Sequence, residues 1–356
     1  MAEGKYVKIG GAIKQVVGEY AKVGGAIVTG TINAVDIDGI KQITLAEADR
    51  YIYTSESVND ELYRITDTGV EDWHYDLADA LAVAVNSDGE SYWCVGTTLV
   101  KLYADGSFAW SHAGWAETSL AVALENRLGV TYVYYSDFGG GVICLRDNGA
   151  SSSDVWSVNV DITFTPPVYA LAVDAANGLV YAGVGVAAAS KGVWRAAVST
   201  GTFVKIFSSS YHIMALACDT SGRVYSGDSH SNYNKLSSDG YVYWTKTRGD
   251  AIHSIEIAHN GYGYFTCESE KKVCKFEPST GVTIWEYTPG LSSYAYACAV
   301  DAEGNVYVVY RYLAGSSGNF IYKVDKNGNY VTRWQSYVNV KFYGMAATPG
   351  LEAAGF

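Results

Sequence analysis

The sequence is poor in charged residues, proline and methionine. Charged residues make up 17% of the chain, and there are 5 prolines and 3 methionines. Intrinsic disorder requires low hydrophobicity and high charge, so the 49% hydrophobic content excludes that class. No apolar run approaches the roughly 18 residues of a membrane-spanning helix, and the N-terminus lacks the apolar core of a secretory signal. Neither feature is therefore expected, and synthesis in a reducing cytoplasm fits best.

The cysteines lack the paired spacing of metal-binding or haem-binding motifs. Cys267 and Cys274 flank the predicted turn from Glu268 to Lys272, so a disulfide across a hairpin remains an alternative to two free thiols. Cys218 and Cys298 lie in small apolar runs and are expected to be buried free thiols. The remaining two cysteines are Cys94 and Cys144.

Positive charge is also scarce. The formal net charge is -12, and the isoelectric point is near 4.9. An acidic surface repels nucleic-acid phosphates and anionic lipid, so neither a nucleic-acid partner nor membrane insertion is expected.

What the sequence has in abundance is tyrosine and glycine, and they recur with a period. A turn glycine followed three residues later by tyrosine occurs six times, and Tyr53 stands in the same context without the glycine. The seven tyrosines are 39, 40, 49, 44, 39 and 43 residues apart. The six pairs are Gly89/Tyr92, Gly129/Tyr132, Gly178/Tyr181, Gly222/Tyr225, Gly261/Tyr264 and Gly304/Tyr307.

Each repeat unit has the pattern of four short strands. An alanine-rich strand precedes the glycine turn, the tyrosine strand follows, a third strand carries Lys or Arg, and a fourth ends in tryptophan. Only the fourth unit lacks the tryptophan, where Phe207 is the expected substitute. Seven such units predict an all-β fold, a seven-bladed β-propeller of four-stranded antiparallel blades over residues 41–356. We expect residues 343–348 to pair in the first blade, with an eighth blade built from both termini as the alternative.

Two stretches resemble a known repeat. Lys101 to Trp110 (KLYADGSFAW) and Lys235 to Trp244 (KLSSDGYVYW) resemble the pyrroloquinoline-quinone-type propeller repeat, over roughly residues 43–345. The resemblance implies the propeller fold. The quinone dehydrogenases of that superfamily carry a signal peptide, usually eight blades, a calcium site and often adjacent cysteines. This chain departs from that pattern, so the resemblance implies no enzymatic activity here.

The first 40 residues form a separate segment with a 14-residue repeat. The phrase beginning at Tyr6 (YVKIGGAI) returns at Tyr20 (YAKVGGAI), which predicts two β-hairpins with Gly-Gly turns. The phrase resembles short repeats near the ends of bacteriophage virion proteins. That resemblance implies attachment to other virion proteins through residues 1–40. The alternative is a strand pair that caps the propeller.

Two groups of side chains are candidates for binding. Aligning the units by their glycines brings polar residues to the channel mouth, where a cation or small ligand can bind; the alternative is a solvated rim. These are Asp79, Ser119, His212, Asp250 and Tyr294. A second group of aromatics in long loops suits stacking on a glycan, and comprises Trp115, Tyr134, Tyr135, Phe138, Tyr233, Tyr310 and Tyr312.

No nucleophile elbow, phosphate loop or zinc spacing is present, so no catalytic residue, metal or cofactor is predicted. We expect a non-enzymatic structural or adsorption protein of a bacteriophage particle (tail, fibre or capsid decoration), located in the virion. Its propeller would recognise a host-surface glycan or protein. A cellular lectin-like or protein-binding propeller is one alternative. A metal-dependent lactonase-like or lyase-like enzyme using Asp79, His212 and Asp250 is another.

Overall fold

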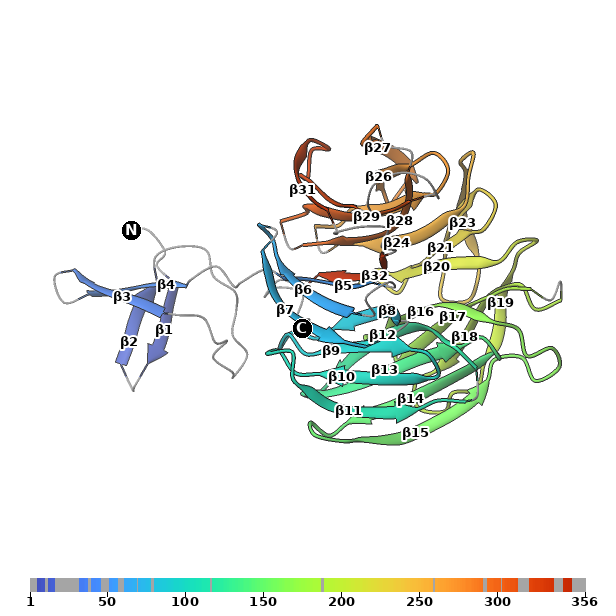
Figure 1. Cartoon of the computed structure of the whole chain (residues 1–356), viewed down its shortest axis with the longest axis horizontal. Coiled ribbons are helices and arrows are strands. Elements are labelled where there is room, and N and C mark those ends of the chain that lie inside the picture. Colours follow the sequence, from blue (N-terminus) through green and yellow to red (C-terminus); the bar gives the residue numbers. More distant parts are fainter. Residues whose placement is uncertain are drawn as a thin grey trace.

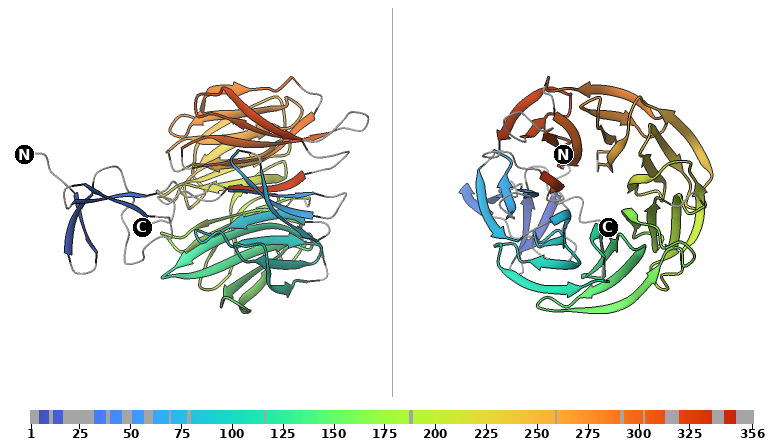
Figure 2. Two further views of the ribbon diagram at one scale, coloured as in Figure 1. Left: turned by 60° about the vertical axis from the view of Figure 1, so that its left-hand side comes forward. Right: turned by 45° about the vertical axis from the view of Figure 1, so that its right-hand side comes forward.

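The fold is all-β, with seven four-stranded antiparallel sheets arranged as the blades of a propeller (Figures 1 and 2). The computed structural model describes residues 5–9, 12–16, 32–37, 40–45, 51–56, 61–68, 70–77, 80–115, 117–186, 189–258, 260–290, 293–301, 303–312, 320–335 and 342–347. Across these residues, no helix has the length and apolar character needed to cross a membrane. The predicted fold class and blade number are confirmed.

Blades are numbered here from one to seven in chain order, and each runs from the innermost to the outermost strand. Blade one contains β32 (Phe342–Ala347), β5 (Tyr51–Glu56), β6 (Glu61–Thr66) and β7 (Glu71–Asp76). Blade two contains β8 (Ala80–Val85), β9 (Ser91–Val95), β10 (Thr98–Leu102) and β11 (Phe108–Ala113). Blade three contains β12 (Ser119–Arg127), β13 (Val130–Asp137), β14 (Gly141–Asp147) and β15 (Ser152–Asn159). Blade four contains β16 (Val168–Asp174), β17 (Leu179–Val184), β18 (Gly192–Ala197) and β19 (Val204–Ser208).

The remaining blades repeat the same order. Blade five contains β20 (Ile213–Cys218), β21 (Val224–Asp228), β22 (Asn232–Leu236) and β23 (Val242–Thr247). Blade six contains β24 (Ile252–Ile257), β25 (Gly263–Cys267), β26 (Lys272–Glu277) and β27 (Val282–Tyr287). Blade seven contains β28 (Ser293–Val300), β29 (Val306–Tyr312), β30 (Phe320–Val324) and β31 (Tyr330–Gln335).

The ring closes by pairing its last strand with its first. β32 is antiparallel to β5, with Ala346 opposite Tyr53 and Ala347 opposite Ile52. The predicted pairing of the C-terminal segment in the first blade is therefore confirmed, and the alternative of an eighth blade is wrong. In this antiparallel pair the last residue of β32 lies beside the first residues of β5, so the chain joins and leaves the ring on the same face.

Four further strands precede the ring. β1 (Lys5–Ile9) pairs with β2 (Ala12–Val16), and β3 (Ile32–Ile37) pairs with β4 (Ile40–Leu45). The first predicted hairpin is confirmed, since β1 and β2 flank the Gly-Gly pair. The second copy of the 14-residue repeat lies outside the described residues, and the predicted division of the chain at residue 40 remains a prediction.

The repeated tyrosines fill the core between blades. In six blades the tyrosine pairs with an alanine or glutamate of the innermost strand and with a Lys or Arg of the third strand. In blade three the predicted Tyr132 has partners of the same kind, Glu125 and Arg146, but the ring that meets the blade's tryptophan is that of Tyr134, opposite Ala123 and Cys144. Tyr134 is fully buried and donates a 2.7 Å hydrogen bond to Glu125, whereas Tyr132 is half-buried.

The basic residues of the third strands link neighbouring blades. Lys235 donates to the Pro278 carbonyl oxygen in the next blade, and the Trp244 indole donates to the same oxygen, at 3.1 and 3.2 Å. Turn Gly281 stacks against the Trp244 ring; a Cβ there would lie 3.0 Å from Cε3, and φ is +68°. Six of the seven junctions have the same link, from Arg64 to Ala104, Lys101 to Gly149, Arg195 to Ser238, Lys235 to Pro278, Lys275 to Lys326 and Lys323 to Asp67.

The fourth unit departs from this pattern, as the sequence indicates. Its fourth strand carries Phe207, which pairs with Val193 and packs half-buried against the core. Here the basic link is made by Arg195, and blade three reaches blade four through the Trp156 indole, 2.7 Å from the Val198 carbonyl oxygen. Phe207 therefore supplies apolar contact without the indole hydrogen bond.

Candidate functional site

The innermost strands all begin on one face of the ring, which we call the start face. It is defined by the first residues of these strands, Ala80, Ser119, Val168, Ile213, Ile252, Ser293 and Phe342. The chain joins the ring at Tyr51 and leaves it at Ala347 on the opposite face. The loops after each second strand, and those before each innermost strand, lie on the start face.

Every innermost strand has a register shift within its first few residues, which marks a β-bulge on the start face. A bulge adds one residue and changes the direction of a side chain, and bulges are common beside binding sites. In six strands the extra residue is half-buried; these residues are Leu81, Leu120, Tyr169, Met214, His253 and Tyr296. Sequence alignment by the turn glycines cannot locate such an insertion.

The bulges contribute to a row of aromatic rings across blades three to five. Phe138 is 48% exposed and meets Tyr169 edge-on, with ring centroids 6.4 Å apart. Tyr169 in turn stacks on His212 at 5.8 Å. Burial and the positive charge of Lys191 lower the pKa of His212 below its ordinary value, which favours the neutral imidazole.

Beside this row, blade three places two buried polar side chains opposite each other. Ser119, at the start of β12, pairs with Asp137, at the end of β13. They are 1% and 3% exposed. Among the described residues, neither the Ser119 Oγ nor the Asp137 Oδ2 has a hydrogen-bond partner. Buried polar atoms almost always have one, so this pair requires an explanation.

The loop after Asp137 is built from glycines that allow close packing. The Gly141 amide donates a 2.7 Å hydrogen bond to Asp137 Oδ1. A Cβ at Gly141 would lie 2.8 Å from Asp137 Oδ2 and 2.6 Å from Trp115 Cε3, so the indole lies beside the carboxylate. Glu117 is exposed nearby, and its Cγ lies 3.0 Å from the position of a Cβ at Gly139.

Burial raises the pKa of Asp137 above its ordinary value, and the negative charge of Glu117 acts in the same direction. Hydrogen bonds from the loop amides oppose the shift without cancelling it. The carboxylate is thus held in an environment that favours either a proton or a cation.

In blade five the aspartate at the equivalent position has hydrogen-bond partners for both carboxylate oxygens. Asp228 lies at the end of β21, opposite Ile213, and is 2% exposed. Its Oδ1 accepts hydrogen bonds from the amides of His230, Ser231 and Asn232, at 3.0, 2.8 and 2.9 Å. Its Oδ2 accepts one from the Asn232 side chain, at 2.8 Å. Both carboxylate oxygens of Asp228 thus stabilise the turn that follows β21, whereas Asp137 Oδ2 has no hydrogen-bond partner among the described residues.

The other predicted channel-mouth residues have varied surroundings. Asp79 lies outside the described residues. Asp250 accepts hydrogen bonds from the Ser269 and Glu270 amides, so its carboxylate holds the turn between β25 and β26. Tyr294 is half-buried in β28. The sequence missed Asp137, although two units place an aspartate at the end of the tyrosine strand.

The predicted loop aromatics divide into two groups. The prediction that Tyr134, Tyr135, Tyr233 and Tyr310 lie in loops is wrong, since all four belong to strands and are at most 2% exposed. The alternating strand pattern extends further than the turn signals suggest, so these rings point into the core. Trp115 and Phe138 lie in start-face loops as expected. Tyr312 ends β29, and its side chain lies outside the described residues.

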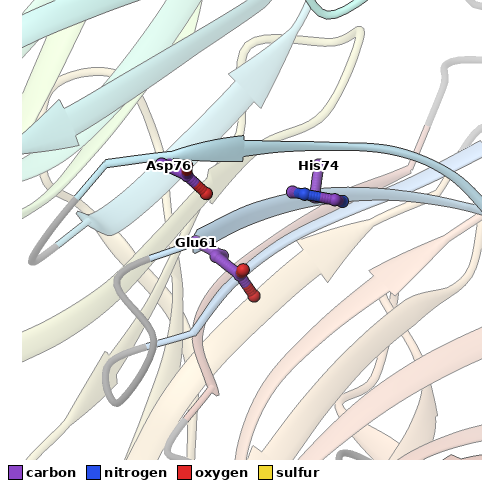
Figure 3. A group of neighbouring side chains, drawn as sticks. All are labelled: Glu61, His74 and Asp76. Carbon is purple, nitrogen blue, oxygen red and sulfur yellow. The ribbon is translucent and has the colours of Figure 1, made fainter.

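A separate group of potential metal ligands lies on blade one, at the start-face end of its outer strands. Figure 3 shows Glu61 on β6 and His74 and Asp76 on β7. One ligand atom from each lies within 4.8 Å of the others, and it is the single such group in the described residues. His74 and Asp76 are exposed, and Glu71 binds the His74 ring at 2.8 Å.

Comparisons with known proteins support the fold alone. No family model and no curated protein matches the sequence. A Bacteroides caccae protein of unknown function is similar over 84% of this chain and 99% of its own, with 10% identity and a TM-score of 0.55. The Cps50 (Swd1) β-propeller domain of Myceliophteria thermophila covers 73% of this chain and 88% of its own, at 13% identity and a TM-score of 0.61.

A third similar structure is Raptor from Chaetomium thermophilum, with 8% identity and a TM-score of 0.61. The match covers 73% of this chain and 25% of that protein. At such identities the likeness extends to the propeller fold and not to function. The chain is therefore a β-propeller whose activity must be argued from its own residues.

Proposed function

We propose that the chain is a non-enzymatic recognition protein of a bacteriophage particle. In this proposal, residues 1–40 attach to other virion proteins, and the start face of the propeller meets a host-surface glycan or protein. The observation that carries the proposal is the path of the chain, which joins and leaves the ring on the face opposite the start face. An attached propeller then leaves its start-face loops accessible to a partner.

The N-terminal repeat supports the attachment half of the proposal. Its first copy forms the β1–β2 hairpin, and two short strands cannot build an independent core. Pairing with a neighbouring protein is a common way to stabilise such a segment. The absence of a match to any family model leaves the resemblance to virion repeats as a prediction.

Localisation in the native source tests this proposal. Antibody-gold labelling of purified particles, viewed by electron microscopy, should place gold on tails, fibres or capsids. Gold confined to cell envelopes or to the soluble fraction of the host would refute a virion role. Particles from a mutant lacking residues 1–40 should lose the label while the free propeller still folds.

A lectin-like function is the second candidate, favoured by the aromatic row of Phe138, Tyr169 and His212. Exposed aromatic rings beside carboxylates are suited to stacking on sugars and binding their hydroxyl groups. On a glycan array, Phe138→Ala should abolish binding that a matched change on the opposite face, Tyr241→Ala, leaves intact. Tyr241 is 69% exposed, so its removal controls for loss of a surface aromatic.

A further inference from the structure

We infer that Ser119, Asp137 and Glu117 bind a divalent, calcium-like cation at the start face of blade three. The inference concerns a site within the propeller, and it stands whether or not the chain belongs to a virion. It begins with the two buried oxygen atoms that lack partners among the described residues, Ser119 Oγ and Asp137 Oδ2.

Both orphaned oxygens are hard donors that can share one ion. They belong to residues directly opposite each other on β12 and β13, so a single small species between the strands can reach both. Calcium is bound by carboxylate, hydroxyl, carbonyl and water oxygens in irregular, flexible sets. Asp137 Oδ1 already accepts a hydrogen bond from the Gly141 amide, so Oδ2 is the oxygen that can bind the ion.

A second carboxylate supplies the remaining charge. The Cγ of Glu117 and the Oδ1 of Asp137 lie 3.0 and 3.5 Å from the position of a Cβ at Gly139. Glu117 precedes β12 and Asp137 ends β13, and the repulsion between these two neighbouring acids adds to the effect of burial in raising the pKa of Asp137. A divalent cation neutralises both charges. Because Glu117 is exposed, water molecules can complete the shell on that side.

An internal water molecule is the competing explanation. Water can accept a hydrogen bond from the Ser119 hydroxyl and donate one to Asp137, but it leaves the repulsion between the two carboxylates in place. The contrast with Asp228 also favours a cation. At that position backbone amides and an asparagine side chain donate hydrogen bonds to both carboxylate oxygens.

Terbium luminescence offers a direct test because Trp115 lies beside the proposed site. A Cβ at Gly141 would lie 2.6 Å from Trp115 Cε3 and 2.8 Å from Asp137 Oδ2, so a lanthanide ion on Asp137 would be excited through this indole. The full chain, stripped with EDTA, should show tryptophan-sensitised Tb³⁺ emission that calcium displaces. Calcium should raise the melting temperature, with a dissociation constant of about 10⁻⁴–10⁻³ M, as in extracellular calcium modules.

Variants separate the cation from its alternatives. Asp137→Asn and Ser119→Ala should lose both the emission and the thermal shift, and Glu117→Gln should weaken calcium binding about tenfold, since ligand charge sets affinity. Trp115→Phe should lose the emission and keep the thermal shift. Asp228→Asn, the matched control, should keep the calcium response whatever its basal stability.

Two outcomes would overturn the inference. The first is a wild-type protein that shows neither emission nor a calcium-dependent shift. The second is a response that survives in Asp137→Asn. In that second case, loss of the response in Glu61→Gln or His74→Ala would assign the ion to the exposed group on blade one.

Discussion

Lys101 is a residue whose charge is enclosed by the protein. Its side chain is fully buried, with Nζ 2.7 Å from Asp147 Oδ2 and 2.9 Å from Glu90 Oε1. The same Nζ donates to the Gly149 carbonyl oxygen across the junction between blades two and three. The Lys101 ammonium neutralises two neighbouring carboxylates, and without it these carboxylates would lose their ion-pair partner.

Replacing Lys101 with methionine should therefore be costly. Lys101→Met leaves Asp147 and Glu90 without their cation and should lower the free energy of unfolding by about 3–5 kcal/mol. Lys235→Met is the matched control, because the hydrogen-bond acceptor of Lys235 is a neutral carbonyl oxygen, and this change should cost about 1 kcal/mol. Urea unfolding of both variants measures the difference, and equal losses would contradict the argument.

Strand length decides which tyrosine of blade three, Tyr132 or Tyr134, is the buried core ring. The glycine spacing predicts Tyr132, but the hairpin of β12 and β13 is longer than its counterparts, so Gly129 lies two residues further along the strand. The period between Tyr92, Tyr134 and Tyr181 becomes 42 and 47 residues. A turn signal fixes where a hairpin ends, and strand length decides which residue reaches the core.

Removal of each ring should expose this difference. Tyr134→Ala deletes a fully buried ring and its hydrogen bond to Glu125, and should cost about 3–5 kcal/mol of unfolding free energy. Tyr132→Ala removes a half-buried ring and should cost less than half as much. Thermal unfolding followed by circular dichroism would distinguish them, and a larger loss at Tyr132 would reinstate the spacing based on Gly129.

At the scale of strands, the innermost strands differ in one residue that the repeat does not explain. Six of them place alanine opposite the repeated core tyrosine, whereas β24 places Glu256 opposite Tyr264. Burial raises the pKa of Glu256 from 4.5 to about 8. Sequence alignment alone shows the substitution but not the burial that shifts its titration.

This shift predicts a pH dependence of stability. A carboxyl group whose pKa is raised on folding contributes stability that is present below its ordinary pKa of 4.5 and is lost as the pH rises to about 8. Glu256 remains partly exposed, which reduces the size of the effect. Glu256→Gln should unfold at higher urea concentration than the wild type above pH 8, with little difference near pH 5. A difference that is constant with pH would contradict the raised pKa.

The candidate site was only partly predictable from strand patterns. Trp115, Ser119 and Phe138 were identifiable as residues near the ends of strands, but the pairing of Ser119 with Asp137 depends on the bulge after Ser119. The stacking of Tyr169 on His212 likewise depends on a bulge in β16. A bulge changes which side chains meet without changing the apolar pattern, so it leaves no clear trace in sequence.

On the scale of the whole molecule, the blade count and ring closure follow from the repeat itself. Each unit buries its apolar faces only against a neighbour, so seven tyrosine periods and a leftover first strand predict a closed ring. Lys323 completes the circle by binding Asp67 in blade one, at 3.1 Å across 256 residues of sequence.

Loss of β32 should consequently affect the entire ring. Deleting residues 342–356 removes the innermost strand of blade one and should lower the melting temperature by at least about 10 °C. Deleting residues 348–356 alone is the control and should leave the melting temperature unchanged, since β32 is retained. An unchanged value for the longer deletion would refute closure through β32.

The six basic links between blades all run in one direction, from a Lys or Arg of one blade to a turn carbonyl of the next. Such a junction joins two different surfaces, so its geometry can either close on itself or continue between molecules. A ring opened at blade one would display a donor surface at Lys323 and an acceptor surface at Asp67. Two opened copies can exchange these surfaces, and at high concentration the same contacts that close the monomer would join chains into open-ended polymers.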